Sequence, residues 1–110
     1  MENLSSLSQE INLLHADICS ALADPTRILI LYMLADKPYT VNDLVAGLGA
    51  TQSATSRHLK VLRDRGLVRA TRQGQNVEYA LNDPRVVGAL DTLRAVLRDT
   101  LERRANLVAE

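Results

Sequence analysis

The sequence predicts a small, mainly α-helical domain with one β-hairpin, and three observations support that class. The chain has 110 residues, of which 46% are hydrophobic and 24% are charged, as in an ordinary folded domain. It contains no Trp and no Phe, so Leu, Ile, Val and Ala have to build the core. Apolar residues recur at helical spacing near both ends, while residues 67–81 show the alternation of strands. We therefore expect residues 1–110 to form a single domain.

The first two predicted helices lie before residue 39. A helix over residues 4–22 carries one apolar stripe, because its apolar residues follow a spacing of three and four. The stripe consists of Leu4, Leu7, Ile11, Leu14, Ile18 and Leu22. Asp24 is a typical N-cap for the next helix, and Pro25 suits its first turn. This second helix presents a broad apolar face over residues 28–34 and ends at residues 36–38.

Two short helices follow, with a tight turn between them. The first begins at Thr40, which stands three residues before Asp43 as in a capping box with Asp in place of Glu. The second begins at Thr51 or Ser53, and a glycine follows each helix. The inner face of the second helix is predicted to consist of Thr55, Leu59 and Leu62. Residues 40–65 therefore form a predicted helix-turn-helix.

The remaining sequence predicts a hairpin and a long last helix. Two strands, residues 67–72 and 77–81, are joined by the polar tip "QGQN" at residues 73–76. A last helix over residues 84–108 repeats the apolar spacing of the first helix. Its apolar residues are Val86, Leu90, Leu93, Leu97 and Leu101.

A helix-turn-helix followed by a hairpin is the winged-helix plan, so the predicted order is α-α-α-α-β-β-α. In that plan the second helix of the pair enters the DNA major groove, and the hairpin over residues 67–81, the wing, reaches a neighbouring backbone or minor groove. The outer side of the second helix and the wing then supply the candidate DNA-binding residues. They are Gln52, Ser53, Ser56, Arg57, His58, Lys60, Arg63, Arg72, Gln73, Gln75 and Asn76.

The chemistry of these side chains suits the task. Gln and Arg form paired hydrogen bonds with base edges, and Ser hydroxyls bind bases or phosphates. The small Ser53 and Ser56 let the helix approach the groove floor, while Lys60 and Arg63 supply charge for phosphates. Arg72 is the candidate on the wing for a phosphate or minor-groove contact.

The distribution of charge supports this surface, although the formal net charge is zero. Six of the 13 Lys and Arg residues lie between positions 57 and 72, and Asp64 is the single acid among them. Association with nucleic acid depends on local potential, so a neutral total does not argue against it. The alternative interpretation is an ordinary solvated basic face. For His58 two interpretations also stay open, a DNA contact or a half-buried histidine satisfied within the fold.

Three segments in this order resemble the ArsR/SmtB family of bacterial winged-helix repressors: "ALADPTRILILYML", "TQSATSRHLKVLRDRGLV" and "RQGQNVEYAL". The resemblance covers roughly residues 15–81. It implies a homodimer whose first and last helices form the interface, and which leaves its operator when an inducer binds. The alternative for the same apolar residues is packing within one protomer. The expected interface residues, which we call the apolar seam, are Leu4, Leu7, Ile11, Leu14, Ile18, Val86, Leu90, Leu93, Leu97 and Leu101.

The metal sites of that family do not carry over. Its arsenic and cadmium sensors resemble one another in a "CVC" pattern, whereas the matching residues 40–42 are Thr, Val and Asn. Its zinc-type site uses histidine and acidic ligands on the last helix, whereas residues 83–110 contain neither His nor Cys. We predict no metal and no cofactor, and the alternative is a two-ligand clip of His15 and Cys19 or a site that they share across a dimer. Cys19 itself is expected to be a small buried hydrophobe near the apolar seam, or a redox site if exposed.

Together these features predict a sequence-specific DNA-binding transcriptional regulator. The most direct form is a homodimeric repressor that binds double-stranded DNA at an imperfect palindromic operator and is released by a non-metal signal. The alternative is a winged-helix module that binds a protein, although the outer residues of the second helix form no apolar patch. We predict no enzyme, because the sequence offers no phosphate loop, ligand cluster or nucleophile motif in a suitable context. It offers no membrane span or signal peptide either, so we expect a cytoplasmic protein.

Overall fold

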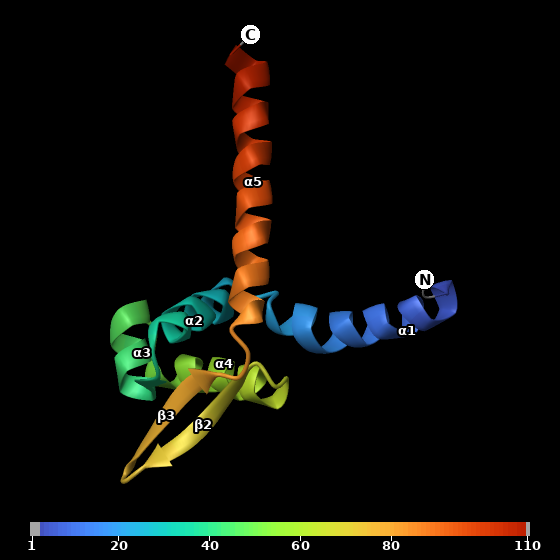
Figure 1. Ribbon diagram of the computed structural model, residues 1–110. Coiled ribbons are helices and arrows are strands. Elements are labelled where there is room, and N and C mark those ends of the chain that lie inside the picture. The colour runs from blue at the N-terminus through green and yellow to red at the C-terminus, as the bar shows by residue number, and fades with distance from the viewer. Residues whose placement is uncertain (1–2, 110) are drawn as a thin grey trace.

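Figure 1 shows the computed structural model of the protein, which describes residues 3–109. The predicted domain limits, 1–110, thus include residues 1, 2 and 110, which lie outside the described residues. Along the chain the elements are α1 (Leu4–Leu14), the π-helical turn η1 (His15–Cys19), α2 (Pro25–Asp36), β1 (Tyr39–Thr40), α3 (Val41–Leu48), α4 (Gln52–Asp64), β2 (Val68–Gln73), β3 (Asn76–Leu81) and α5 (Arg85–Ala109). The predicted order of helices and hairpin strands is confirmed, and one short strand, β1, is added.

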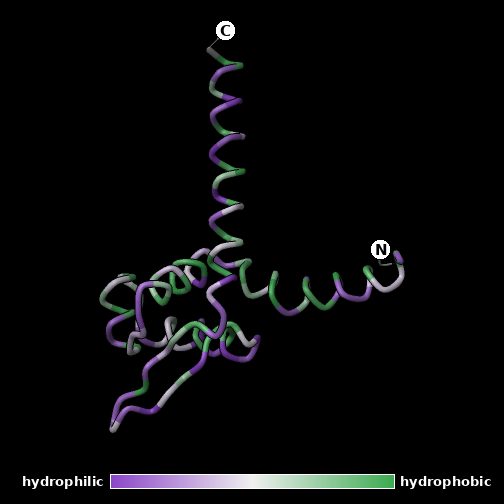
Figure 2. The backbone as a smooth tube through the Cα atoms, viewed as in Figure 1, coloured by the Kyte–Doolittle hydropathy of each residue, from purple (hydrophilic) through white to green (hydrophobic). Residues whose placement is uncertain are grey.

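The molecule consists of a compact body, formed by α2 to β3, from which α1 and α5 project in different directions (Figure 1). The radius of gyration is 17.1 Å and the principal extents are 56 × 43 × 21 Å. A compact chain of this length has a radius of gyration of about 13 Å. Figure 2 shows hydrophobic and hydrophilic residues following one another along both projecting helices. Much of the apolar surface of α1 and α5 therefore lacks a neighbour within the protomer.

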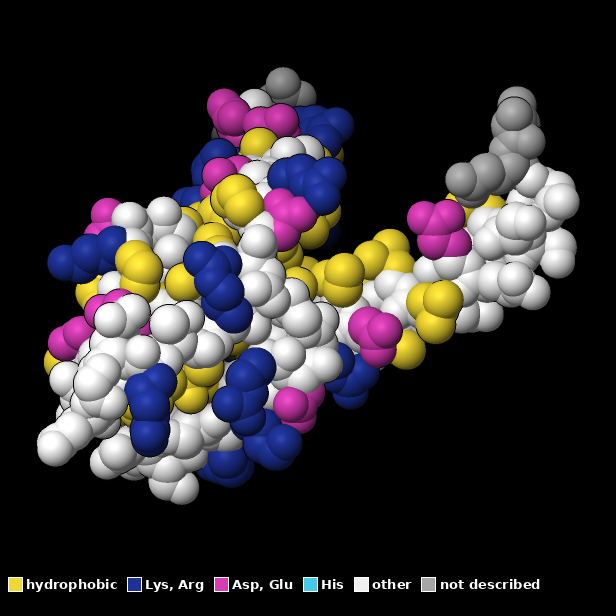
Figure 3. Space-filling view, turned by 60° about the horizontal axis from the view of Figure 1, so that its bottom comes forward, with side chains coloured by type: hydrophobic (Ala, Val, Ile, Leu, Met, Phe, Trp, Pro, Cys, Tyr) yellow, Lys and Arg dark blue, Asp and Glu magenta, His cyan; other side chains and the backbone are white. Residues whose placement is uncertain are grey.

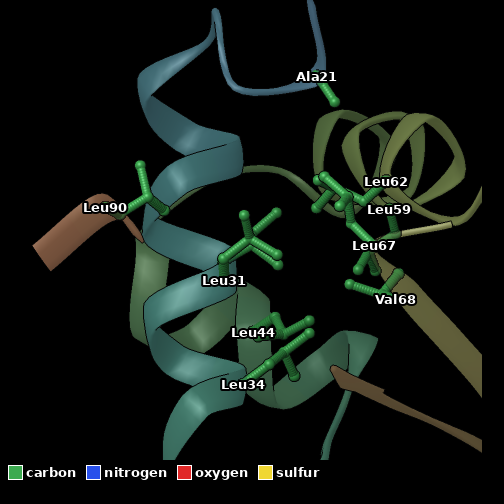
Figure 4. Close-up of a cluster of buried hydrophobic side chains, with 10 residues drawn as sticks. Ala21, Leu31, Leu34, Leu44, Leu59, Leu62, Leu67, Val68 and Leu90 are labelled. Carbon is green, nitrogen blue, oxygen red and sulfur yellow. The ribbon is translucent and has the colours of Figure 1, made fainter. Parts of the chain in front are cut away.

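The core of the body lies between α2, the helix pair α3 and α4, and the start of β2. Its fully buried large side chains are Ile30, Leu31, Leu44, Leu59, Leu62 and Val68. In Figure 4, Leu59 and Leu62 of α4 point toward Leu31 of α2. Full burial of each such side chain contributes about 1.5–3 kcal/mol. The predicted inner face of α4 is confirmed, including Thr55, whose hydroxyl donates to the carbonyl oxygen of Thr51 at 2.8 Å.

The helix starts follow the predicted capping residues. The Asp24 carboxylate accepts from the backbone N–H of Thr26 at 2.8 Å, and Pro25 occupies the first turn of α2. Thr40 and Asp43 form the reciprocal capping box of α3. At α4 the two alternatives are resolved: Thr51 is the N-cap and accepts from the N–H of Ala54 at 3.1 Å, whereas Ser53 lies inside the helix. The caps fix where the helix-turn-helix begins and turns.

The sheet is antiparallel and has three strands in the order β1-β3-β2. The hairpin runs in register from the Val68 and Leu81 pair to the Gln73 and Asn76 pair. The connecting loop is therefore shorter than the predicted tip and consists of Gly74 and Gln75, with Gly74 at φ +64°, where glycine is favoured. The strand at residues 39–40 was not predicted, because two residues are too few for an alternating pattern.

The first predicted helix, 4–22, is interrupted. Regular α-helix ends at Leu14, the π-helical turn η1 follows, and a last helical turn reaches Ala21. A π turn accommodates one extra residue per turn, so it rotates the residues after it relative to those before it. Ala21 is fully buried against the body, whereas none of the residues of α1, all of which the structure describes, is buried. The π turn lies between the projecting part and the anchored part of this helix.

The last helix is attached to the body near its start. Leu90 is only 6% exposed and belongs to the core, and the Asp91 carboxylate accepts from the Tyr32 hydroxyl of α2 at 2.6 Å. Asp83 precedes the helix and accepts from the backbone N–H of Arg85 at 2.9 Å. Hydrogen bonds from the Arg85 side chain and backbone lower the pKa of Asp83 to about 2. Beyond Arg94, whose guanidinium lies 5.1 Å from the centre of the Tyr32 ring, the helix continues into solvent.

Candidate nucleic-acid interface

Helix α4 has two clearly different sides. Thr55, Leu59 and Leu62 are fully buried, so the opposite side of the helix faces away from the body. The exposed residues on that side, which we call the reading row, are Gln52, Ser53, Ser56, Arg57 and Lys60. The structure therefore brings together five of the predicted DNA-binding residues on one exposed helix face. Figure 3 shows Lys and Arg side chains spread over the face of the molecule that carries α4 and the hairpin.

The basic side chains of α4 differ in whether they form an ion pair. Lys60 donates to the Asp64 carboxylate at 2.9 Å, one turn along the helix. This hydrogen bond from Lys60 lowers the pKa of Asp64. Arg57 and Arg63 are exposed and have no ion pair with the described residues. Two guanidinium groups on α4 are thus available to an external anion.

The wing projects from the body beside α4 (Figure 1). Its predicted contact residues, Arg72, Gln73, Gln75 and Asn76, are all exposed. They are polar or basic, and they lie at the loop and at the last paired positions of β2 and β3. The geometry of a helix with a polar, basic row beside an exposed polar hairpin matches the two-part contact that a winged helix makes with a duplex.

Two arginines of the basic run are held by the fold. Arg69 donates to the Leu81 carbonyl oxygen at 2.6 Å, across the hairpin. Arg65 donates to the Ala16 carbonyl oxygen at 2.8 Å and pairs with the Asp17 carboxylate at 3.1 Å. These roles were not predicted, because the partners lie 12 residues away in one case and 48 or 49 residues away in the other. Local sequence patterns carry no signal for such contacts.

His58 lies beside the reading row but turns toward α2. Its side chain is 21% exposed, and its Nδ1 lies 3.4 Å from Nη1 of Arg27, which can only donate. Its Nε2 lies 4.0 Å from the Asp24 carboxylate. Desolvation raises the pKa of Asp24, but the backbone N–H groups of Arg27 and Thr26 and the nearby His58 and Arg27 outweigh it and lower the pKa. The arrangement matches the half-buried alternative for His58, in which the ring is satisfied by the fold.

The apolar seam is exposed over most of its length. The exposed fraction of its large side chains runs from 39% at Leu7 to 77% at Leu4, and it is 61% at Leu93. Three members differ: Ile18 and Val86 are half-buried, and Leu90 lies in the protomer core. The same helices expose further apolar residues that were not predicted, namely Leu13, Val96, Leu107 and Val108. A wider stripe than one residue per turn would have included them.

A cavity of about 660 Å³ opens between the two projecting helices where they leave the body. Its apolar lining includes Ile18 of η1, Leu22 just after it, and Val86 and Leu93 of α5. Cys19 lines the same cavity and is exposed, so the expectation of a buried cysteine is wrong for the protomer. Within residues 3–109, the structure brings no three His, Cys, Asp or Glu side chains together in a way that could hold a metal ion.

No helix in the described part of the chain combines the length and the apolar character that a membrane crossing requires.

The fold and this surface define a winged helix-turn-helix protein of the kind found in bacterial transcriptional regulators. A sequence profile described as "Bacterial regulatory protein, arsR family" matches residues 24–70. The solution structure of Mb0332 from Mycobacterium bovis, described as a homodimeric winged helix-turn-helix DNA-binding domain, superposes with a TM-score of 0.76. It is 24% identical and covers 93% of each chain, which confirms the winged helix-turn-helix fold.

Two related proteins show the family of this chain through their sequence identity. The HTH-type transcriptional regulator YgaV of Escherichia coli K12 is 37% identical over 82 residues, which cover 74% of this chain and 83% of YgaV. The HTH-type transcriptional regulator NmtR of Mycobacterium tuberculosis is 43% identical over 76 residues, which cover 69% of this chain and 63% of NmtR. The matched region thus spans slightly less than two thirds of NmtR. The chain belongs to the ArsR family, which consists of transcriptional regulators and not of enzymes.

Proposed function

We propose that the protein is a homodimeric transcriptional repressor that binds a specific, imperfectly palindromic operator in double-stranded DNA. The observation that carries this proposal is the reading row on α4, which is exposed, polar and basic. Arg57 lies near its centre with no ion pair to the described residues. Such a side chain is suited to bidentate contact with a guanine, while Gln52 is suited to adenine.

The wing supplies the second part of the proposed contact. Arg72 is exposed near the end of the hairpin, where a guanidinium group can reach a phosphate or the minor groove. Gln73, Gln75 and Asn76 add hydrogen-bonding groups around it. Phosphate contacts fix the register of a protein on the duplex, and base contacts select the sequence. In this scheme Arg63 and Lys60 assist with phosphate charge, and His58 orients α4 from within the fold.

The proposed dimer is supported by the exposed part of the apolar seam. Leu7, Ile11 and Leu14 of α1 and Leu93, Leu97 and Leu101 of α5 are all more than one third exposed in the protomer. Exposed apolar stripes of this kind on two projecting helices mark an interaction surface. Association through it would be two-fold symmetric and would place two α4 helices about 34 Å apart, one turn of DNA. The operator then has two related half-sites.

The proposed signal for release is not a metal ion. This part of the proposal rests on the chain itself, which has Thr, Val and Asn at residues 40–42 and no His or Cys after residue 82. A borderline metal such as zinc requires thiolate or imidazole ligands in sufficient number. A regulator that works on DNA is also expected in the cytoplasm.

Selection from a random duplex library, followed by fluorescence anisotropy across a salt series, tests the proposal. The full-length protein should enrich a sequence with two related half-sites and bind it at least about a thousandfold more tightly than scrambled DNA. The logarithm of the affinity should fall steeply and linearly with the logarithm of the salt concentration. Failure to enrich any sequence, with weak binding that ignores salt, would contradict the proposal and favour a protein-binding module.

A further inference from the structure

The end of the first helix is joined to α4 at two separate points. Both joints are made by arginine side chains, and both reach the short stretch from Ala16 to Ala21. This stretch includes most of the π-helical turn, and it connects the projecting α1 to the body. The α4 helix carries the reading row. The joints therefore connect the helix proposed to form the dimer with the helix proposed to contact DNA.

The first joint lies at the C-terminal end of α4. Arg65 is the residue that follows α4, and its Nη1 donates to the Ala16 carbonyl oxygen at 2.8 Å and to Asp17 Oδ1 at 3.1 Å. The Ser20 hydroxyl donates to the same Ala16 carbonyl oxygen at 2.5 Å. Two side chains thus converge on one backbone carbonyl of the π turn. We call the Asp17 and Arg65 contact the terminal link.

The second joint lies at the middle of α4. Arg27 donates through Nε to the Ala21 carbonyl oxygen at 2.7 Å and through Nη2 to the Ser20 carbonyl oxygen at 3.2 Å. Its third nitrogen, Nη1, lies 3.4 Å from Nδ1 of His58 on α4. One guanidinium group thus bridges the end of the first helix and the middle of α4. Because α4 is contacted at its middle and its end, a rotation of the segment 16–21 would strain both contacts unless α4 moved with it.

We infer that Asp17 and Arg65 are positioning residues, which hold α4 at a fixed place relative to the dimer helices and so set the spacing between the two reading rows. The inference rests on the proposed function, since spacing matters only in a dimer that binds two half-sites. The link does not touch DNA in this scheme. It lowers the freedom of α4 to shift, so that a DNA site with one particular spacing is favoured over its neighbours.

A direct contact between Arg65 and DNA would predict a change of DNA affinity in the opposite direction. If Arg65 contacted a phosphate directly, Asp17 would compete with DNA for it, and removal of the Asp17 carboxylate would strengthen binding to all DNA. If the terminal link positions α4, removal of that carboxylate weakens binding to the selected site while non-specific binding stays equal or rises. The sign of the change at the selected site therefore separates positioning from direct contact.

The test compares Asp17→Ala with Glu10→Ala in the full-length protein. Both variants remove one exposed carboxylate from the first helix, but Glu10 makes no ion pair with the described residues. Asp17→Ala should lower affinity for the selected sequence by about threefold to tenfold, because an exposed ion pair is weak but occurs twice in the dimer. Glu10→Ala should leave that affinity equal or slightly higher. A gain for Asp17→Ala, or equal behaviour of the two variants, would overturn the inference.

Affinity for DNA sites with altered half-site spacing separates positioning from simple stabilisation. A link that only stabilised the fold would not change how affinity depends on the spacing. One base pair is inserted between the half-sites of the selected sequence, or one is removed. The wild-type protein and Glu10→Ala should lose affinity strongly on both altered sites. Asp17→Ala should lose less, because its α4 helices can adjust. An identical penalty for all three proteins would overturn the positioning role.

Hydrogen exchange in the absence of DNA tests the link independently of the proposed function. Asp17→Ala should speed amide exchange over residues 62–66, at the end of α4, relative to wild type and to Glu10→Ala. If the wild-type protein selects no DNA sequence, the proposed function fails, and exchange alone decides the structural link. Unchanged exchange over residues 62–66 would overturn the link in either case.

Discussion

The body and the two projecting helices differ in how far their apolar residues are buried. In α4, Leu59 and Leu62 are fully buried, and the exposed residues are polar or basic. In α1 no residue is buried, although the helix carries as regular an apolar stripe as any in the chain. In α5 the stripe passes from half-buried Val86 to Leu90 in the core and emerges into solvent at Leu93, one turn later. Helical periodicity therefore identifies the apolar face of a helix, but it does not identify the surface that covers that face.

The two regions also differ in what holds them in place. The body has its own core of Leu, Ile and Val side chains around α2, α3 and α4 (Figure 4). The end of the first helix is held to it by buried Ala21, by partly buried Ile18 and Leu22, and by polar contacts of Arg27 and Arg65. We therefore expect the body to depend on its own packing and the projecting helices to depend on association. The predictions below test this division.

The largest expected effect comes from the core of the body. Leu59→Ala should lower the free energy of unfolding by about 2–5 kcal/mol, because it leaves a cavity at a fully buried site. Leu101→Ala, at a site 49% exposed in the protomer, is the matched change outside the body. Denaturant unfolding at equal protein concentration measures both. A larger loss for Leu101→Ala would reverse the proposed division between body and projecting helices.

A charge placed in the apolar seam should separate the subunits without unfolding the body. Leu93→Glu should yield monomers by light scattering and lower operator affinity by about a hundredfold, because each monomer binds one half-site alone. Leu29→Glu introduces the same charge at an exposed Leu of α2, where the exposed fraction is 55% compared with 61% at Leu93. The control should stay dimeric. A dimeric Leu93→Glu protein would contradict an interface through this part of α5.

Within the body, the reading row and the wing should contribute to DNA binding in different ways. Arg57→Ala should lower affinity for the selected sequence by about tenfold and change non-specific binding much less, because a base contact is lost. Arg72→Ala should lower affinity on every sequence and reduce the slope of the salt dependence by about one, because a phosphate contact is lost. Anisotropy on selected and scrambled DNA measures both. Equal losses of both variants on both DNAs would argue against this division of roles.

The smallest expected effect concerns the start of α5. The pKa of Asp83 lies at about 2 because Arg85 donates to its carboxylate from side chain and backbone, whereas its ordinary value is 3.8. The carboxylate therefore stabilises the folded state fully above about pH 4, and this contribution is lost as the pH falls through 2. Asp83→Asn should lower the melting temperature slightly at pH 7, and its difference from wild type should shrink toward pH 2. A difference that is independent of pH would exclude the carboxylate charge as the cause.

Much of the fold was predictable because its signals are local. Asp24, Thr40 and Thr51 begin helices through hydrogen bonds to residues two or three positions away, so their spacing in the sequence is the spacing that matters. The strand β1 and the terminal link were not predictable, since they depend on partners about 40 or more residues away. Leu90 and Leu93 share one stripe, and only the point at which α5 leaves the body determines which of them is buried.

The candidate site was predictable to a similar extent. The inner residues of α4 follow from periodicity, and the residues on the opposite side then follow by helical geometry. The orientation of His58 does not follow, because a side chain at the flank of a helix face can turn either way. The contacts of Arg65 and Arg69 do not follow either, because their partners lie 49 and 12 residues away in the chain. Charge counts over the basic run therefore overstate how many of its guanidinium groups can meet an external anion.

Because no residue of α1 is buried, the order of this helix should depend on the concentration of the protein in the cell. A short helix with no packed face is marginal in water, so most of its order would come from the second copy. The melting temperature should then rise with protein concentration. Newly made chains at low abundance would leave a stretch of unpaired peptide open to proteases, and this stretch would be shielded once copies accumulate. Turnover would thus be fastest when the regulator is scarce, which would sharpen the threshold at which repression begins.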